Sequence, residues 1–288
     1  MSGAAAEGLS EGAARFSEAG FVVIRDMLTA EEVKRFGAAV DAGVAARSAH
    51  DPRSLEQRTR YEQSFRQCLN LWEDRPDVRP LTFHPGIAET ASQLLGARAV
   101  RVWHDQALYK EGGGRRTDAH QDQPYWPIQE ANTITAWIPF QPVDRAMGAV
   151  GYVPGSHRFG VRSFADIFSG SGFDLERGEE ARGVAPEFVD VPAGAVAFHH
   201  GLTIHTAQPN TTDRTRRVHT VIFFADGSHR SRTRHPHPCV DRAGIEPGEL
   251  IASTATPIAW PPPATLPEPP APLDPPSPGW AGWPRARQ

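Results

Sequence analysis

Residues 100–126 read VRVWHDQALYKEGGGRRTDAHQDQPYW, a long strand-like run that leads into the triplet His120-Gln121-Asp122. Along an extended segment, side chains alternate between two faces. His120 and Asp122 would therefore point the same way, and Gln121 would point the other way. The triplet predicts that an imidazole and a carboxylate converge from one strand as two ligands of a metal ion.

The first part of this stretch is one of several strand-like runs in the middle of the chain. The runs are separated by clusters of Gly, Pro and Asp, and they are Val100–Lys110, Thr133–Phe140, Val150–Val153, Ala195–Phe198 and Arg216–Phe224. Many short strands punctuated in this way favour a barrel or a double-sheet jelly roll, the class to which the cupins belong. We expect a mainly β fold with flanking helices.

Helix signals lie before these strands. Phe21–Ile24 is a short β-branched run, after which Thr29 can cap a helix with Glu32 as its capping-box partner. A second helix, Ile87–Leu95, should end at Gly96, because glycine is a common helix stop.

We expect one domain over residues 1–256, with an N-terminal helical lead (1–97) and a jelly-roll core (98–228). A chain of 288 residues is compatible with a single large β domain. Residues 257–288 are rich in proline and should form an extended tail. Two roles for this tail stay open. It either binds a proline-recognising partner, or it is pinned loosely to the body by Trp260, Trp280 and Trp283.

Composition limits the classes of partner. A formal charge of −4 and a pI of about 6.3 provide no basic surface for nucleic acid. The apolar runs, such as Val221 to Ala225, are too short to span a bilayer, and residues 1–12 lack the pattern of a secretory signal. Cys68 and Cys239 are the two cysteines, which fits a reducing compartment. We expect a cytoplasmic protein, monomeric or homodimeric, that binds a small molecule rather than nucleic acid or a membrane.

A third metal ligand has to come from a distant strand. Two histidines and one carboxylate on one face of a metal are the pattern of non-haem Fe(II) oxygenases, whose other coordination positions stay open. His205 is a candidate for the second histidine, and His199 and His200, six and five residues before it, are its rivals.

The combined motifs resemble the phytanoyl-CoA dioxygenase family of Fe(II)/2-oxoglutarate-dependent oxygenases, from about Phe16 to about Asp226. The segments that carry the resemblance, in order, are residues 120–126, Thr135-Ala136-Trp137-Ile138, Gly148, Val153-Pro154-Gly155-Ser156-His157, residues 200–206, Asn210 and Arg216. The resemblance implies a double-stranded β-helix with the metal inside one end. It also favours His205 as the distal ligand and makes His200 a pocket wall or a supporting group.

Arg216 lies where family members carry the arginine that pairs with the C5 carboxylate of 2-oxoglutarate. A planar guanidinium can bind a carboxylate through two hydrogen bonds. On a strand, Arg216 shares its face with Val218, Thr220, Ile222 and Phe224, whereas its competitor Arg217 would face solvent or make a surface pair.

Further co-substrate contacts are less specific. The alternation of Val100–Lys110 places Gln106 and Lys110 on one face with His104 and Leu108, and relatives often carry a lysine or polar group from this strand near 2-oxoglutarate. Thr206 could donate a hydrogen bond to 2-oxoglutarate, and Trp137 either packs beside it or fills the core. The two aromatic residues after the metal pair, Tyr125 and Trp126, are candidates for the substrate side, while Arg53, Arg58, Arg60, Arg66 and the stretch 168–183 could form lids.

The resemblance implies an enzyme with Fe(II), 2-oxoglutarate and O2 that hydroxylates an unactivated C–H of a small metabolite or natural-product intermediate and releases succinate and CO2. Desaturation, cyclisation and epimerisation are alternative outcomes of the same cofactor chemistry. A non-catalytic cupin-like protein that binds a metal or ligand is the alternative from another class, and a metal-dependent isomerase or hydrolase is a third.

Overall fold

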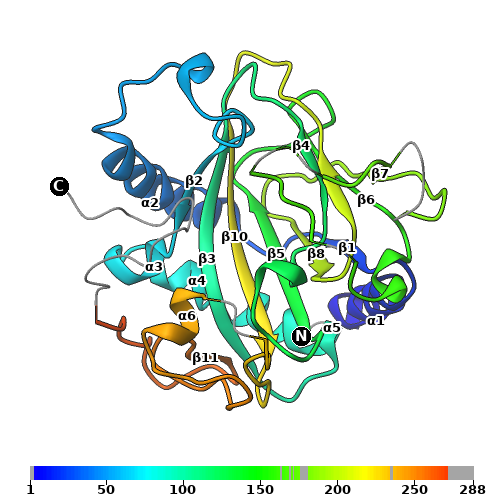
Figure 1. The fold of residues 1–288 in the computed structure, drawn as a ribbon, viewed down its shortest axis with the longest axis vertical. Coiled ribbons are helices and arrows are strands. Elements are labelled where there is room, and N and C mark those ends of the chain that lie inside the picture. The colour runs from blue at the N-terminus through cyan, green and yellow to red at the C-terminus, as the bar shows by residue number, and fades with distance from the viewer. Residues whose placement is uncertain are drawn as a thin grey trace.

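Two antiparallel sheets form the body of the protein, shown in a computed structural model that describes residues 3–162, 164–168, 170, 172–175, 181–233 and 236–271 (Figure 1). The larger sheet has the strand order β1-β8-β5-β10-β3-β11, with β2 also pairing with β3, and the smaller sheet has the order β4-β9-β6-β7. The strands are β1 (Phe21–Ile24), β2 (Arg66–Leu69), β3 (Val100–Lys110), β4 (Thr117–His120), β5 (Thr133–Pro139), β6 (Val150–Tyr152), β7 (Glu187–Phe188), β8 (Val196–His200), β9 (His205–Ala207), β10 (Arg216–Ala225) and β11 (Ile258–Trp260).

Helices flank this body. They are α1 (Gly3–Ala19), α2 (Ala30–Ser48), α3 (Leu71–Asp74), α4 (Arg79–Thr82), α5 (Pro85–Leu95) and α6 (Pro238–Asp241), with the 3-10 turns η1 (Leu55–Gln57), η2 (Gln123–Tyr125) and η3 (Ser156–Phe159). In Figure 1, α2, α3 and α4 lie on one side of the long strands β3 and β10, and β4, β6 and β7 lie on the other. The mainly β, jelly-roll fold is confirmed.

Strands β3 and β10 pair along their whole length, from Arg216 opposite Lys110 to Ala225 opposite Val100, with one register shift after Ile222. Their ranges match the strands predicted from alternation. The alternation also sorts the side chains correctly. Val218 packs between the two sheets, whereas Val221 packs on the outer face with residues of α2 and α5.

The helix signals of the N-terminal part are confirmed. The Thr29 hydroxyl accepts from the Glu32 N–H at 3.2 Å, and the Thr29 N–H donates to the Glu32 carboxylate at 2.9 Å, which closes the capping box of α2. Helix α5 ends at Gly96, whose φ of 63° is a left-handed conformation that favours glycine. The same part of the chain also supplies β1 and β2 to the larger sheet.

The proline-rich part begins with an edge strand. β11 pairs with the outer side of β3. Proline has no backbone N–H to donate, so a proline-rich segment is suited to the edge of a sheet. Ala259 is fully buried and Trp260 packs against the core of helices and sheet. Trp280 and Trp283 lie outside the described residues, as do Ser169, Ser171 and residues 176–180 of the predicted lid. No helix in the described ranges is long and apolar enough to cross a membrane.

Candidate metal and co-substrate site

His120 and His205 face each other across the smaller sheet. They are register partners on β4 and β9, and their ring centroids lie 4.2 Å apart. The pairing of these strands therefore brings together two histidines that are far apart in the sequence.

Asp122 reaches the same point by a different route from the one that alternation predicts. Strand β4 ends at His120, and Asp122 has the helical angles φ −76° and ψ −40° at the start of η2, where Pro124 favours a turn. The prediction that both residues share one strand face is therefore wrong, although the two side chains do lie close together. Gln121 does point away, since its amide donates to the Leu202 carbonyl at 2.7 Å.

The three ligand atoms surround one small space. An Asp122 carboxylate oxygen, Oδ1, lies 3.5 Å from Nε2 of His120 and 3.6 Å from Nε2 of His205, and the candidate ligand atoms all lie within 4.8 Å of one another. Two nitrogens and one oxygen at this spacing suit a divalent transition metal.

The backbone sets the tautomer of both histidines. Nδ1 of His120 lies 2.9 Å from the Asp118 carbonyl, and Nδ1 of His205 lies 3.0 Å from the Thr203 carbonyl. A carbonyl only accepts, so each Nδ1 carries the proton and each Nε2 keeps a lone pair for a metal. Burial lowers the pKa of His205 to about 3, which keeps its ring neutral.

Asp122 is held from behind by two donors. Its other oxygen, Oδ2, lies 3.1 Å from Nε2 of His199 and accepts from the Thr135 hydroxyl at 2.9 Å. Burial opposes ionisation of Asp122, but the neighbouring imidazoles outweigh it and hold the pKa of the carboxyl well below its ordinary value. The contacts leave Oδ1 free to face the two ligand histidines.

His199 was considered only as a rival ligand in the sequence, and its contact with Asp122 was missed. The contact follows from the register of β8 against β5, in which His199 lies opposite Thr135, and the sequence does not reveal this register. His200, expected to be a pocket wall or a supporting group, does not line the cavity. Its Nδ1 accepts from the Leu202 N–H at 3.0 Å instead.

One cavity contains the three ligand residues and most of the predicted co-substrate contacts. Gln106, Trp137, Thr206 and Arg216 line it, together with His199. The Thr206 hydroxyl donates to the Thr117 carbonyl at 2.6 Å, and Gln106 accepts from the Gln67 amide. These two polar groups are therefore already partly used within the protein.

Arg216 is the unsatisfied charge of this cavity. Its side chain is 2% exposed, its guanidinium carbon lies 5.4 Å from the centre of the Trp137 ring, and it donates to the Gly148 carbonyl. Its Nε has no hydrogen-bond partner, and none of the ion pairs within the described ranges includes Arg216. Burial lowers the pKa of Arg216 to about 10, so it remains a cation at neutral pH. A buried cation without a counter-charge suits a carboxylate ligand.

Lys110 lies beside Arg216 but not in the cavity wall. It is fully buried, pairs with Arg216 across β3 and β10, and donates to the Arg115 carbonyl. Burial, and then the neighbouring guanidinium, hold the pKa of Lys110 well below its ordinary value. Its surroundings favour a neutral amine. Arg217, by contrast, faces outward and pairs with Asp41 at 2.7 Å, as the alternation predicts.

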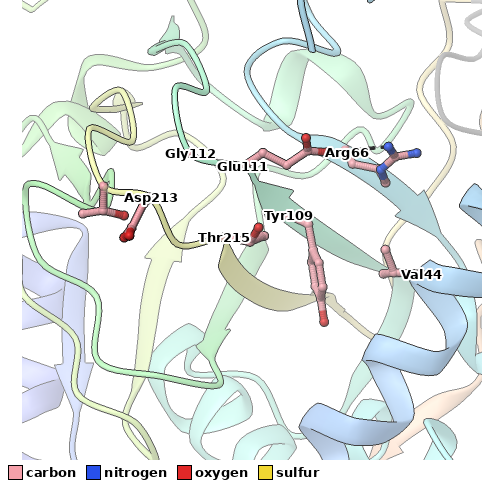
Figure 2. A pocket seen from close by; sticks show the side chains of 8 residues that line it. Val44, Arg66, Tyr109, Glu111, Gly112, Asp213 and Thr215 are labelled. Atoms are coloured by element: carbon pink, nitrogen blue, oxygen red, sulfur yellow. Dashed lines mark ion pairs between the residues drawn. The ribbon is translucent and has the colours of Figure 1, made fainter. Parts of the chain in front are cut away.

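A second hollow lies outside the larger sheet and has a different character (Figure 2). Tyr109, Glu111, Asp213 and Thr215 contribute to its lining, and Arg66 pairs there with Glu111 at 3.6 Å. None of the predicted metal or co-substrate residues lines this hollow. The candidate chemistry is therefore confined to the cavity between the sheets.

A model of the family described as phytanoyl-CoA dioxygenase (PhyH) matches residues 16–218, which is most of the chain. The chain belongs to the phytanoyl-CoA dioxygenase family. Among curated proteins of this family, it is 26% identical over 158 residues to a phytanoyl-CoA dioxygenase domain-containing protein 1 homolog from Caenorhabditis briggsae, with 51% of this chain and 54% of that protein covered. It is 24% identical over 143 residues to a probable alpha-ketoglutarate-dependent hypophosphite dioxygenase from Stutzerimonas stutzeri, with 48% and 50% covered. The chain therefore spans about half the length of the curated relatives it matches.

Solved structures extend the likeness over most of the fold. The non-haem alpha-ketoglutarate-dependent carbocyclase SnoK from nogalamycin biosynthesis is 28% identical, with a TM-score of 0.71 over 86% of this chain and 95% of that one. The epimerase SnoN, in complex with Fe3+, alpha ketoglutarate and nogalamycin RO, is 22% identical with a TM-score of 0.73 over 88% and 99%. EctD from S. alaskensis is 20% identical with a TM-score of 0.66 over 85% and 86%. At these lower identities SnoN and EctD support the fold, which is the jelly roll of Fe/2-oxoglutarate oxygenases.

Proposed function

We propose that this protein is an Fe(II)- and 2-oxoglutarate-dependent oxygenase in which His120, Asp122 and His205 bind the metal. One observation carries the proposal. The three residues present free ligand atoms to the same cavity in which the buried Arg216 lacks a counter-charge. A metal alone would leave Arg216 unexplained, whereas a metal and a dicarboxylate together satisfy both features.

The fit assigns a task to each predicted residue. Arg216 binds the C5 carboxylate of 2-oxoglutarate, and Trp137 packs beside the bound molecule and the guanidinium. Thr206 and Gln106 line the space between this anchor and the metal. Lys110 lies opposite Arg216 across β3 and β10 and supports it from outside the cavity lining.

Iron and 2-oxoglutarate supply the oxidation when bound: O2 and 2-oxoglutarate give succinate and CO2, and the second oxygen atom enters a C–H bond of the substrate. The residues of the chain itself orient and enclose the metal and the co-substrate. His199 and Thr135 fix the carboxylate of Asp122, and the backbone carbonyls fix the two imidazoles. Three protein ligands leave the remaining metal positions for the co-substrates.

Hydroxylation of a small metabolite or natural-product intermediate in the cytoplasm is the outcome we favour, and Asp122 supports it. A carboxylate at this position occupies a metal site and disfavours a halide there. Ring closure is the second candidate, since the chain is similar to a carbocyclase over 95% of that enzyme. Arg216 argues against a non-catalytic cupin-like protein with a structural metal, and against an isomerase or hydrolase, because these do not need an anchor for 2-oxoglutarate.

Anaerobic addition of Fe(II) and 2-oxoglutarate tests the proposal without a substrate. We expect the weak visible absorption band of the metal–2-oxoglutarate chelate in the wild-type protein. It should be absent from His205→Ala, and it should require a higher concentration of 2-oxoglutarate in Arg216→Lys. A wild-type protein that binds Fe(II) but forms no band with 2-oxoglutarate would overturn the proposal.

A further inference from the structure

The walls of the cavity near the metal have two different chemistries. Arg216 lies opposite Lys110 at one end of β3, whereas His104 lies six residues earlier on the same strand, roughly 20 Å away at ~3.3 Å per residue. Around His104 and the metal site, the lining is rich in aromatic and aliphatic side chains, with the uncharged polar Gln67 and Thr135 among them, and it includes Tyr61, Phe65, Tyr125, Trp126, Ile167 and Phe168. The first end suits a carboxylate, and the second does not.

The aromatic rings in this second region form one connected group. The Tyr61 ring lies 4.4 Å from that of Phe168 and 5.1 Å from that of Phe65, and Tyr125 lies 6.1 Å from Phe168 and 5.9 Å from the metal-ligand candidate His120. The group thus begins beside the metal and extends outward to Phe168, whose side chain is 37% exposed.

The hydroxyls of the two tyrosines in this group make hydrogen bonds within the protein. Tyr61 donates to the Gln67 side chain at 2.9 Å, and Tyr125 donates to the Ala165 carbonyl. Both tyrosines therefore offer rings rather than hydroxyls to a bound molecule. Burial raises the pKa of both, so neither becomes an anion at neutral pH.

Charge is scarce in the cavity wall. Among its described lining residues, the carboxylate and guanidinium groups are those of Asp122 and Arg216, which the metal and the co-substrate use. Arg60, which is not part of this lining, is paired with Asp118 at 3.6 Å. A charged group on a molecule next to the rings would therefore be buried without a partner, at a high cost in free energy.

His104 offers a polar contact within this apolar region. Its side chain lines the cavity and is 3% exposed, and its ring meets Trp126 edge-on at 6.1 Å. Burial lowers the pKa of His104 to about 4, so the ring is a neutral imidazole that can donate and accept at neutral pH.

We propose that the substrate is an uncharged molecule with an aromatic ring system that packs against the rings of Tyr61, Phe168 and Tyr125 and presents a hydroxyl or carbonyl oxygen to His104. This inference rests on the proposed oxygenase function and names its substrate class. Rings of this kind pack by offset or edge-to-face contact, which the connected group provides. The same walls disfavour coenzyme A esters at this position, inorganic oxyanions and zwitterions.

Three bicyclic probes of similar size separate shape from charge: 2-naphthol, 2-naphthoate and decahydro-2-naphthol. Each is titrated anaerobically into protein loaded with Fe(II) and saturating 2-oxoglutarate, so that Arg216 is occupied. Binding is measured by calorimetry and by the change in the chelate absorption band. We expect 2-naphthol to bind roughly tenfold more tightly than either of the other two. Equal or tighter binding of 2-naphthoate, or no binding of 2-naphthol, overturns the proposal.

Variants locate the probe. Phe168→Ala and His104→Leu should each weaken 2-naphthol binding roughly tenfold, and the matched control Val161→Ala, whose side chain is 61% exposed in the same loop, should not. Tyr61→Phe should bind like the wild type, because the lost hydroxyl contacts Gln67. Unchanged binding in both Phe168→Ala and His104→Leu overturns the proposal. If the chelate band forms but 2-naphthol fails, the substrate class is wrong and the oxygenase function stands. If the band never forms, the function itself is wrong.

Discussion

The side chain of His199 orients the carboxylate of Asp122. We therefore expect that replacing His199 weakens the binding of Fe(II). Replacing His199 by Phe removes the donor 3.1 Å from Oδ2 and frees the carboxylate to rotate. We expect Fe(II) affinity to fall about tenfold, the lower range for partners of metal ligands. Anaerobic titration with Fe(II) measures it. His199→Gln keeps an N–H donor and should restore part of the affinity, whereas an unchanged dissociation constant in His199→Phe would show that Thr135 suffices.

Arg216 has a matched control beside it in the sequence. In Arg216→Lys an ammonium replaces the planar fork, and we expect the KM for 2-oxoglutarate to rise about tenfold or more, since hydrogen bonds to charged groups contribute roughly 1.5–3 kcal/mol. Arg217→Lys changes the same residue type on the outer face, where Arg217 pairs with Asp41. Its KM should stay at the wild-type value. Succinate formation, or the chelate titration, gives both numbers, and similar effects in the two variants would exclude Arg216 as the anchor.

Among the secondary-structure elements, the strands can be predicted from the sequence better than the turns. The long strands β3 and β10 follow from alternation, because a buried inner face and a helix-covered outer face both require apolar residues at fixed parity. The conformation of Asp122 does not follow, since a one-residue change from strand to turn is decided by η2 and its contacts. His199 needed the register of β8 against β5, a tertiary fact that two adjacent histidines leave open.

Helix α3 depends on a buried carboxylate from β3. Asp105 accepts from the N–H groups of Leu71 and Trp72 at 2.7 and 3.1 Å, and from the Thr82 hydroxyl at 2.6 Å. Asp105→Asn keeps the shape but loses the charge and part of these bonds. We expect the free energy of unfolding to fall by about 1–3 kcal/mol in chemical denaturation. The exposed Asp77→Asn serves as the control and should change little.

The difference in free energy of unfolding between the wild type and Asp105→Asn should change with pH in one direction. Burial opposes ionisation of Asp105, but the nearby His219 and the hydrogen bonds hold its pKa below the ordinary 3.8. The stability that Asp105 contributes is therefore present above pH 3.8 and lost as pH falls through the lower folded-state pKa. The difference in free energy of unfolding between the wild type and Asp105→Asn should therefore become smaller as the pH falls below 3.8. A difference that grows below pH 3.8 would contradict this role of Asp105.

Within its described residues, the proline-rich part packs on the body of the molecule through β11. β11 adds the buried Ala259 and the packed Trp260 to the body, whereas residues 261–271 are largely exposed. A chain that ends at Pro263 should melt within about 2 °C of the wild type, and one that ends at Thr256 should melt at least about 5 °C lower, since roughly 1 kcal/mol corresponds to 2–4 °C at this size. Thermal melting monitored by circular dichroism compares them. Equal melting of the two would mean that β11 is dispensable.

The sequence places the whole molecule in the right fold and family, but it cannot show how distant parts close the cavity. Tyr61, Phe168 and Tyr125 come from three separate segments, and their meeting depends on side-chain contacts outside any repeated strand pattern. The sequence also does not show the partners of the arginines that we expected in a lid. Arg53 and Arg58 are paired with Glu62 and Glu111, which the residue types alone do not reveal.

The uncompensated charge of Arg216 has a consequence for the lifetime of the protein under the proposed function. Folding buries this cation whether or not a dicarboxylate is present, so 2-oxoglutarate that binds only the folded chain raises the free energy of unfolding, by about 2.7 kcal/mol at a hundred times its dissociation constant. Pulse proteolysis with Fe(II) present should show slower degradation as 2-oxoglutarate increases, and Arg216→Leu should lose this protection. In a cell short of 2-oxoglutarate, the enzyme would then be removed faster by proteases, so that its abundance follows the supply of its own co-substrate.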